Sequence, residues 1–344
     1  MIRVGINGFG RIGRALTRII SSKRKFKIVL INDIDQDIKN LSYLLKYDSI
    51  YGKFLGNVSS NKSVIKINNN KVKLSSKMKI NEVPWSQNKV DIVIDSSGTS
   101  NNVTLAKKVL KQKVKKIIIT HSPKKNIDYT MILGVNEKDY NHNDHKIISS
   151  SICDASAIAP VLKQIDQKWG IESGFITTLH SRLSYQNLLD GTLRSISSPG
   201  HNWKDYSLGR NSMASLIPKK TTAVDAVIRT LPNLQNKLSG MSFRVPTAIV
   251  CGSDLSIKLK SSIKLNEVRK HFQKIAKQNK KIFEYQTEAL VSIDHLKTTK
   301  SSIIDANYID VVNANLLKMV IWYDNEWGYS SRVVDILDFI SKKK

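Results

Sequence analysis

Short apolar runs alternate with helical patterns in the first third of the chain. Four runs have the composition of buried strands: Arg3–Asn7, Lys27–Ile31, Val90–Asp95 and Lys115–Thr120. Apolar residues at helical spacing cover Arg14–Ile20 and Asn102–Gln112. This alternation predicts an α/β domain with a doubly wound parallel sheet. The segment 51–79 is polar, β-branched and rich in asparagine, which predicts short antiparallel strands and turns.

The pattern changes around Pro160. One face of a helix that begins near Cys153 is marked by Val161, Leu162, Ile165 and Trp169. Further strands are predicted at Phe175–Leu179, Ser242–Val245, Ala248–Val250, Leu255–Leu259, Ala289–Ile293 and Leu317–Trp322. Helical spacing returns in Thr222–Leu231 and Ser330–Ile340. This mixture predicts a second, α+β domain built on a mainly antiparallel sheet.

Length and composition support two domains. A chain of 344 residues that is 41% hydrophobic can bury a core in each of them. We expect residues 1–152 to form the first domain, 153–325 the second, and about 326–344 a final helix. The polar segment between His180 and Pro218, which includes Ser197–Gly200, is too long for a plain connector and is expected to have a function.

Cysteine usage points to a reducing compartment. The chain has two cysteines, Cys153 and Cys251, which form neither a disulfide framework nor a metal-ligand spacing. We therefore expect a cytoplasmic protein without a metal site. Met1–Ile6 runs directly into a strand, and no apolar run reaches the ~18 residues of a membrane span, so no membrane association is expected.

The formal net charge of +27 has three interpretations: nucleic-acid binding, an anionic substrate, or a lysine-biased surface. The lysines are scattered through stretches such as Asn68–Lys71, without a dense basic stripe interleaved with aromatic residues. This distribution favours a lysine-biased surface. Nucleic acid is then only an incidental electrostatic partner.

A glycine motif lies between the first strand and the first helix. Gly8, Gly10 and Gly13 form the pattern GxGxxG, and Asp33 ends the next strand about 20 residues later, as a Rossmann dinucleotide site requires. The glycines allow a tight turn, close approach of the pyrophosphate and close helix packing. Asp33 would accept hydrogen bonds from the adenosine ribose, which favours NAD over NADP. Three glycines in an ordinary turn are the alternative.

Cys153 and His180 are the candidates for covalent chemistry. Cys153 stands at a predicted helix N-terminus, where backbone N–H groups and the helix dipole favour thiolate over thiol. His180 ends a predicted strand and would act as base and proton carrier. From these residues alone, a small buried apolar role for Cys153 and a structural role for His180 are the favoured interpretations.

Six stretches of the chain match motifs of one known family, in the same order: Val4–Arg14, Leu45–Ser49, Gly134–Asn136, Thr177–Ser181, Gly240–Thr247 and Trp322–Tyr329. On these stretches the chain resembles the phosphorylating glyceraldehyde-3-phosphate dehydrogenase family, including its erythrose-4-phosphate dehydrogenase branch. The resemblance implies that Cys153 attacks an aldehyde to give a thiohemiacetal while His180 accepts the proton. Hydride then passes to NAD, and phosphate releases the acyl group from a thioester.

The resemblance also implies which residues bind ligands. The cofactor would contact Arg11, Ile12, Asp33, Met78 through its backbone, Ser97, Gly98, Thr120, Asn325 at the nicotinamide carboxamide, and Tyr329. A phosphorylated aldehyde and inorganic phosphate would contact Thr221, Thr222 and Arg244, with Ile152, Asp154 and Leu183 at matching positions. The final helix would fold back onto the first domain. A homotetramer is implied, in which the segment from Ser181 to Pro218 lines the neighbouring subunit's cofactor site.

Departures from the family cluster around phosphate binding. Asp154-Ala155-Ser156 replaces the usual Thr-Thr-Asn, and Ile152 replaces the usual serine. Leu183 stands where many members have threonine, although the erythrose-4-phosphate branch is apolar there, and Leu208 where an arginine is frequent. A carboxylate about 4 Å from a phosphate charge costs about 4 kcal/mol at an effective dielectric of about 20.

Two positions for the Asp154 carboxylate follow from the sequence. It points into the site, or it turns away and caps the helix by accepting backbone N–H bonds. Positive charge near the site can come from Arg182, Lys219 and Lys220, which are otherwise ordinary solvated side chains.

Three hypotheses on function remain open at this point. The first is a phosphorylating dehydrogenase with a rebuilt phosphate pocket. The second is an NAD-dependent dehydrogenase for a different aldehyde, erythrose 4-phosphate or another sugar or phospho-sugar aldehyde, with release of a free acid by hydrolysis. The third is a non-enzymatic NAD-binding or RNA-binding protein, against which the presence of both Cys153 and His180 argues.

Overall fold

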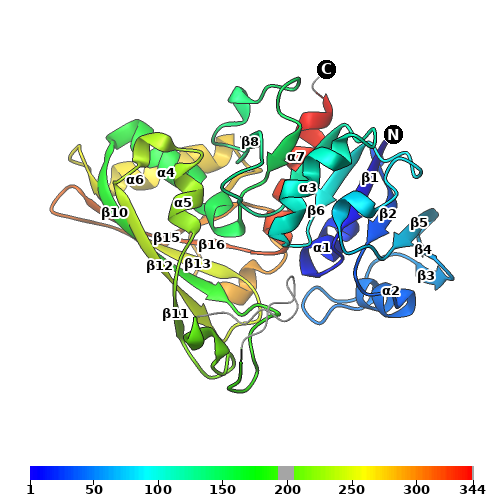
Figure 1. The fold of residues 1–344 in the computed structure, drawn as a ribbon. Helices are drawn as coiled ribbons and strands as arrows, with labels where there is room; N and C mark the ends of the chain where they lie inside the picture. Colours follow the sequence, from blue (N-terminus) through cyan, green and yellow to red (C-terminus); the bar gives the residue numbers. More distant parts are fainter. Residues whose placement is uncertain (193–204, 343–344) are drawn as a thin grey trace. The chain divides into compact units, whose positions relative to one another are not determined.

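The computed structural model describes residues 1–192 and 205–342 and divides the chain into two units (Figure 1). Unit 1 comprises Met1–Met131, Lys138–Ser151 and Ser330–Lys344, and unit 2 comprises Ile132–Glu137 and Ile152–Tyr329. The last helix therefore belongs largely to unit 1. Within that unit, the Lys25 ammonium pairs with the Asp338 carboxylate at 2.8 Å.

Unit 1 contains a nine-stranded sheet in the order β3-β4-β5-β2-β1-β6-β7-β9-β8. Its strands are β1 (Ile2–Asn7), β2 (Phe26–Asn32), β3 (Val58–Asn61), β4 (Val64–Ile67), β5 (Asn70–Ser75), β6 (Ile92–Asp95), β7 (Lys116–Ile119), β8 (Tyr129–Thr130) and β9 (Ile147–Ser149). All neighbouring strands from β5 to β8 are parallel, and the β3-β4 and β4-β5 pairs are antiparallel. The doubly wound fold class and the antiparallel strands within 51–79 are thereby confirmed.

Unit 1 contains helices from both ends of the chain. They are α1 (Arg11–Ile20), α2 (Ile38–Lys46), α3 (Ser100–Leu110) and the C-terminal α7 (Trp327–Lys342), which begins in unit 2. Val103, Ala106 and Val109 place one apolar face of α3 against the core around Trp85. The sequence analysis did not predict α2, whose N-terminus is capped by the Asp37 carboxylate through the N–H groups of Lys39 and Asn40.

Unit 2 contains a seven-stranded sheet in the order β11-β12-β10-β13-β16-β15-β14. Its strands are β10 (Ile171–Ser181), β11 (Ile217–Lys220), β12 (Leu238–Val245), β13 (Cys251–Leu259), β14 (Phe283–Gln286), β15 (Ser302–Val312) and β16 (Leu316–Tyr323). Four of the neighbouring pairs are antiparallel, and β10-β12 and β14-β15 are parallel. The prediction of a mainly antiparallel sheet is confirmed.

Helices α4 (Cys153–Trp169), α5 (Ala223–Ile228) and α6 (Leu265–Gln278) cover one face of this sheet (Figure 1). Ile158, Leu162 and Phe272 join strand residues in one buried core. Along β10 the buried Ile176, Thr178 and His180 alternate with more exposed neighbours. The strand's period of two therefore turns His180 toward the helix-covered face.

Three expectations on local structure were wrong. Ala248–Val250 is a turn, because Val250 has a left-handed φ of +66°, which a strand does not accommodate. Ala289–Ile293 contains no strand and leads into the 3₁₀ turn Ser292–His295. The helix predicted for Thr222–Leu231 covers only Ala223–Ile228, since Pro232 follows and restricts the backbone before it.

The described part of the chain, 1–192 and 205–342, has no helix with the length and apolar character required to cross a bilayer. Of the long segment between His180 and Pro218, the stretch Ser197–Gly200 lies outside the described residues.

Candidate active site

Cys153 is the first residue of α4, and the chain enters this helix through an unusual backbone. Ser151 has a φ of +62°, and Ile152 at the N-cap is extended. No side chain caps the helix. Cys153 itself is partly exposed, whereas its neighbour Asp154 is buried. The thiol thus lies at an accessible edge of an otherwise buried cluster.

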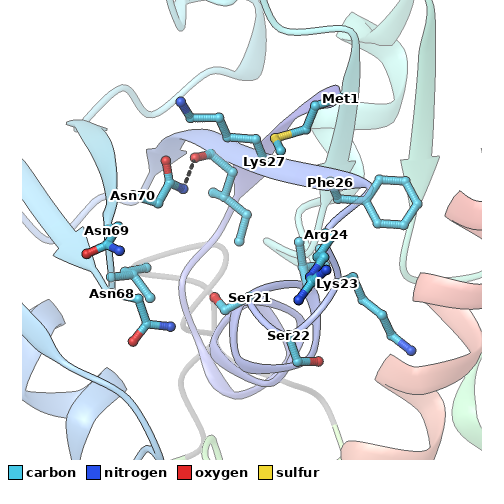
Figure 2. Close-up of a pocket in the computed structure, with 13 residues that line it drawn as sticks. Met1, Ser21, Ser22, Lys23, Arg24, Phe26, Lys27, Asn68, Asn69 and Asn70 are labelled. Carbon is cyan, nitrogen blue, oxygen red and sulfur yellow. Dashed lines mark hydrogen bonds between the residues drawn. The ribbon is translucent and has the colours of Figure 1, made fainter.

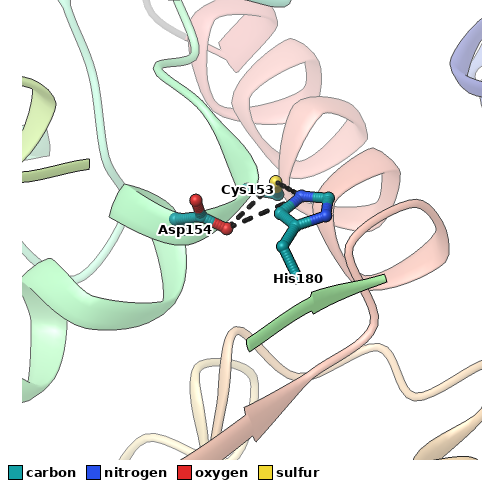
Figure 3. Close-up of side chains that lie close together, drawn as sticks. All are labelled: Cys153, Asp154 and His180. Atoms are coloured by element: carbon teal, nitrogen blue, oxygen red, sulfur yellow. Dashed lines mark hydrogen bonds and ion pairs between the residues drawn. The ribbon is translucent and has the colours of Figure 1, made fainter. Parts of the chain in front are cut away.

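His180 faces the thiol from β10 (Figure 3). The Nε2 atom of His180 lies 3.7 Å from Sγ of Cys153. The other ring nitrogen, Nδ1, lies 2.7 Å from the carbonyl oxygen of Ser181. A carbonyl only accepts hydrogen bonds, so Nδ1 carries the proton in the neutral ring and Nε2 is left with a lone pair. The backbone therefore sets His180 as a base toward Cys153.

The Asp154 carboxylate points into this cluster. Its Oδ1 lies 3.5 Å from Sγ of Cys153 and 3.9 Å from Nε2 of His180. The hydroxyl of Tyr323 on β16 donates to the same Oδ1 at 2.8 Å. The interpretation of Asp154 as a helix cap turned away from the site is therefore wrong. Sequence reasoning missed Tyr323 as its partner, although the residue lies in one of the six matching stretches.

Burial and charge alter the acidity of the cluster. Burial raises the pKa of the Cys153 thiol well above its usual value, and the negative Asp154 raises it further. Both effects oppose the thiolate that the position at the helix N-terminus is expected to favour. Burial lowers the pKa of His180; Asp154 opposes this effect, while Arg244 and Lys219 add to it. Both groups are thereby favoured in their neutral forms before substrate arrives.

Arg244 is a cation beside His180 in the sheet of unit 2. The two residues are directly paired on the parallel strands β10 and β12. Arg244 is 9% exposed, and its Nε has no hydrogen-bond partner among the described residues. A buried guanidinium with an unused donor is suited to an anionic ligand. This arrangement fits the phosphate contact expected of Arg244.

The remaining candidates for substrate binding are linked to the Cys153 cluster less directly than Arg244. Ile152 packs against the core of unit 2. The Thr221 hydroxyl accepts the N–H of Ala223 at 3.0 Å, and Thr222 is the N-cap of α5. The backbone N–H of Leu183 donates to the Gln186 side chain. No hydrogen bond found within 1–192 and 205–342 joins Leu183, Thr221 or Thr222 to the Cys153 cluster.

Leu208, which stands where the family often has arginine, is buried beside Ile217 and Tyr185. Its apolar character is explained by this small satellite cluster.

Asn325 lies at the other side of β10. Its Oδ1 accepts a hydrogen bond from the Ser181 hydroxyl at 3.2 Å, which leaves the amide nitrogen of Asn325 as the donor for another group. Tyr329 is buried near the start of α7. Both residues belong to unit 2, unlike the remaining cofactor candidates.

The glycine motif of unit 1 fits a dinucleotide. Gly8 has a φ of +86°, and a Cβ on it would lie 2.6 Å from the backbone of Ser97. A Cβ on Gly13 would lie 2.1 Å from the Gly8 carbonyl oxygen, whereas one on Gly10 would meet nothing within 4 Å. Gly10 is also the N-cap of α1, which no side chain caps. The motif thus combines a tight turn with an open helix N-terminus, as pyrophosphate binding requires.

Other cofactor candidates line the carboxyl edge of the sheet. Asp33 follows β2, and its Oδ2 accepts the N–H of Phe9 at 2.5 Å, which ties it to the glycine turn. The hydroxyls of Ser97 and Thr120 bond to the side chain and the backbone of Asp95, respectively. These positions follow β2, β6 and β7, which are parallel strands of one sheet, and therefore lie along its carboxyl edge.

Four further candidates complete the set. Gly98 has a φ of +70° with open space at its Cβ, and Met78 is 72% exposed. Arg11, beside Ile12 in the first turn of α1, pairs with Asp48 at 2.5 Å. This ion pair holds the side chain of Arg11 beside Asp48.

A cavity of about 320 Å³ lies elsewhere in unit 1 (Figure 2). It is lined by the end of α1, by Lys23, Arg24 and Lys27, and by Asn68–Asn70 of the β4-β5 turn. None of its lining residues belongs to the candidate sites.

Two family models match the chain. The glyceraldehyde 3-phosphate dehydrogenase NAD binding domain matches residues 2–103, and the C-terminal domain of the same enzyme matches residues 150–325. The chain belongs to the glyceraldehyde 3-phosphate dehydrogenase family. The resemblance stated from the sequence is thus confirmed. The chain is an NAD-dependent dehydrogenase, and its cofactor is NAD.

Curated relatives align over the whole chain. Glyceraldehyde-3-phosphate dehydrogenase 1 of Bacillus cereus is 37% identical over 344 residues, which cover 100% of this chain and 99% of the relative. Glyceraldehyde-3-phosphate dehydrogenase 1 of Kluyveromyces marxianus and glyceraldehyde-3-phosphate dehydrogenase 3 of Saccharomyces cerevisiae are each 38% identical, over 99% of this chain and 100% of the relative. The family assignment therefore applies to both units.

Proposed function

We propose that the chain oxidises glyceraldehyde 3-phosphate with NAD through a covalent intermediate on Cys153. The observation that carries this proposal is the 3.7 Å separation of Sγ of Cys153 and the lone pair-bearing Nε2 of His180. An activated thiol requires a nucleophile and an adjacent base that is held in the right orientation. Here the hydrogen bond of Nδ1 to the Ser181 carbonyl orients the His180 ring. The curated relatives, which are named for this activity, support the choice of substrate.

The reaction begins with a proton transfer within the cluster. The Cys153 thiol passes its proton to Nε2 of His180 as sulfur bonds to the aldehyde carbon. Nδ1–H remains on the Ser181 carbonyl and supports the imidazolium that forms. After this proton has passed to the oxygen of the thiohemiacetal, Nε2 is free to accept it again when the carbon is oxidised. When bound, NAD supplies the hydride acceptor.

We propose that the substrate phosphate binds at Arg244, with Thr221 and Thr222 as further contacts. The unpartnered, buried Nε of Arg244 supports this assignment, because an anion would supply the missing acceptor. Arg244 lies beside His180 through strand pairing, so the phosphate and the catalytic base are held by adjacent strands.

Inorganic phosphate is proposed as the acyl acceptor, with Asp154 weakening its binding. The carboxylate occupies a position where the family has a hydroxyl, and at about 4 Å it opposes an anion by about 4 kcal/mol at an effective dielectric of about 20. Arg244 and Lys219 both lower the pKa of His180 through their positive charge, and the same charge offsets part of this cost. We therefore expect phosphorolysis with a high KM for phosphate.

We further propose a cytoplasmic homotetramer. Phe175, Leu179 and Met241 are 69%, 40% and 38% exposed and lie on the face of the sheet that α4 and α5 do not cover. An exposed apolar face of this kind supports contact with a second copy of the chain. The small number of cysteines, two in 344 residues without the spacing of a disulfide framework, supports a reducing compartment.

The experiment is NADH formation from glyceraldehyde 3-phosphate, with and without phosphate or arsenate. We expect sustained turnover only with one of these anions, and none in Cys153→Ser. The matched control is Cys251→Ser, which removes the other, fully buried thiol. A rate that ignores phosphate and arsenate would contradict the phosphorylating reaction, and an active Cys153→Ser would contradict the covalent intermediate.

A further inference from the structure

Three different metal-ligating atoms converge at the start of α4 (Figure 3). Sγ of Cys153, Oδ1 of Asp154 and Nε2 of His180 lie within 4.8 Å of one another, at separations of 3.5, 3.7 and 3.9 Å. Zinc bonds of about 2.0–2.3 Å at tetrahedral angles separate such atoms by about 3.3–3.6 Å. The group needs to close by only a few tenths of an ångström to bind one ion.

The neighbouring residues hold two of these ligands in the required form. The Nδ1–H of His180 is bound to the Ser181 carbonyl, which leaves Nε2 as the ligating atom. The Tyr323 hydroxyl donates to the Asp154 carboxylate and directs it toward the thiol. Carbonyl and hydrogen-bonding partners of this kind orient the ligands in known metal centres.

The donor set selects the type of ion. A thiolate, an imidazole and a carboxylate suit zinc, whereas magnesium and calcium prefer oxygen ligands alone. Thiolate and carboxylate together neutralise the divalent charge, so the bound ion adds no net positive charge beside Arg244 and Lys219. Cys153 is partly exposed, so the ion has access and a fourth position remains for water.

We propose that Cys153, Asp154 and His180 form a zinc site that reversibly blocks the active site. Zinc binds Sγ, Oδ1 and Nε2, and the thiol proton is released to solvent. The ion then occupies the nucleophile and the base at once. The carboxylate ligand is this chain's own departure, since the family has threonine after the nucleophile. A metal site was not expected from the sequence, and only the inhibition, not the binding, depends on the proposed function.

Cobalt(II) as a spectroscopic probe tests binding without any turnover. We expect one ion per chain, a thiolate-to-cobalt charge-transfer band and the intense visible absorption of tetrahedral cobalt, with displacement by zinc. Cys153→Ser should lose the charge-transfer band, while the control Cys251→Ser should keep it. An octahedral spectrum, or a band that persists in Cys153→Ser, would overturn the site.

Zinc affinity then tests the other ligand and its partner. Against a chromophoric chelator, Asp154→Asn should bind zinc at least about 100-fold more weakly, and Tyr323→Phe about 10- to 100-fold more weakly. The two variants are independent, so a folding defect in one leaves the other decisive. Equal affinity in wild type and Asp154→Asn would contradict a three-ligand site.

The final measurement is zinc inhibition of NADH formation, with recovery on EDTA. If zinc binds as described but the chain does not oxidise glyceraldehyde 3-phosphate, the proposed function fails while the metal site stands. If the chain is active but zinc neither binds nor inhibits, the metal site fails alone.

Discussion

The hydroxyl of Tyr323 donates to Oδ1 of Asp154 at 2.8 Å and thereby fixes a carboxylate beside the reactive thiol. Tyr323 is 2% exposed and comes from β16, the strand that pairs with β13 through Cys251. Since both partners are buried, the carboxylate has no solvent-facing alternative of similar energy. Its charge therefore acts on every anion that approaches Cys153.

Asp154→Asn is expected to lower the KM for phosphate at least about tenfold. The amide keeps an oxygen for the Tyr323 hydroxyl but removes a charge that opposes phosphate by about 4 kcal/mol at about 4 Å and an effective dielectric of about 20. The measurement is NADH formation at saturating aldehyde with varied phosphate. The exposed Asp310 on β15 provides the control Asp310→Asn. An unchanged or higher KM in Asp154→Asn would show that the carboxylate does not repel phosphate.

His180→Asn is expected to reduce kcat by about 10²–10⁴, the usual contribution of a general base. NAD affinity, followed by titration, should stay near the wild-type value because His180 belongs to unit 2 and the glycine motif to unit 1. The control is His271→Asn, which removes a partly buried histidine that packs on Trp169 of the same unit. A loss of kcat below threefold would remove His180 from the mechanism.

The fold was predictable because its signals are local. Gly8, Gly10 and Gly13 lie directly between an apolar strand and a helical pattern, and this context together with Asp33 identifies the turn. Even α6, which the sequence analysis missed, has a local signal: Val268, Phe272 and Ala276 are buried at helical spacing. Short apolar runs without such a context misled the prediction, and Val250, buried in a left-handed turn, is the example.

The candidate site was predictable only in part. Cys153 and His180 could be identified from matching stretches, but the direction of the Asp154 carboxylate could not. That direction depends on Tyr323, a partner 169 residues away in the chain, and on the burial of both side chains. The raised pKa of Cys153 has the same origin, because it follows from burial and from the nearby Asp154 carboxylate.

Asp33→Asn is expected to weaken NAD binding about tenfold or more and to narrow the preference for NAD over NADP. The carboxylate is held by the N–H groups of Phe9 and Asp35, at 2.5 and 2.9 Å, and would accept from the ribose hydroxyls. Hydrogen bonds to a charged group contribute about 1.5–3 kcal/mol, which corresponds to this loss. Titration with both cofactors measures it, with the half-buried Asp35→Asn as control. Equal affinities in all three proteins would contradict the role of Asp33.

Phe175→Asp is expected to shift the assembly from tetramer toward smaller species. Phe175 is 69% exposed next to Leu179 on the uncovered face of β10, and burial of a phenylalanine side chain contributes about 1.5–3 kcal/mol per copy. Light scattering across a dilution series gives the mass. Leu55→Asp, at a 96% exposed position in unit 1, is the control. A wild type that is monomeric at all concentrations would disprove the tetramer itself.

Lys116→Met tests how a buried charge links stability to pH. The Lys116 ammonium donates to the carbonyl oxygens of His142 and His145. Burial lowers the pKa of Lys116 from its ordinary 10.5 to about 8, and neighbouring Lys146 adds to this shift. Between pH 8 and about 10.5 the unfolded chain therefore holds more protons than the folded chain. The free energy of unfolding must rise with pH in that window.

Below pH 8 both states carry the charge, and the cost of burying it is fully present; above about 10.5 both are neutral and the cost is gone. Lys116→Met has no such group, so the Tm of wild type relative to this variant should increase between pH 8 and 10.5. Thermal unfolding at several pH values measures the difference, with the exposed Lys66→Met on β4 as control. A difference in Tm between wild type and Lys116→Met that stays constant with pH would contradict this prediction. Lys116 would then titrate as it does in the unfolded chain, and its burial would carry no electrostatic cost.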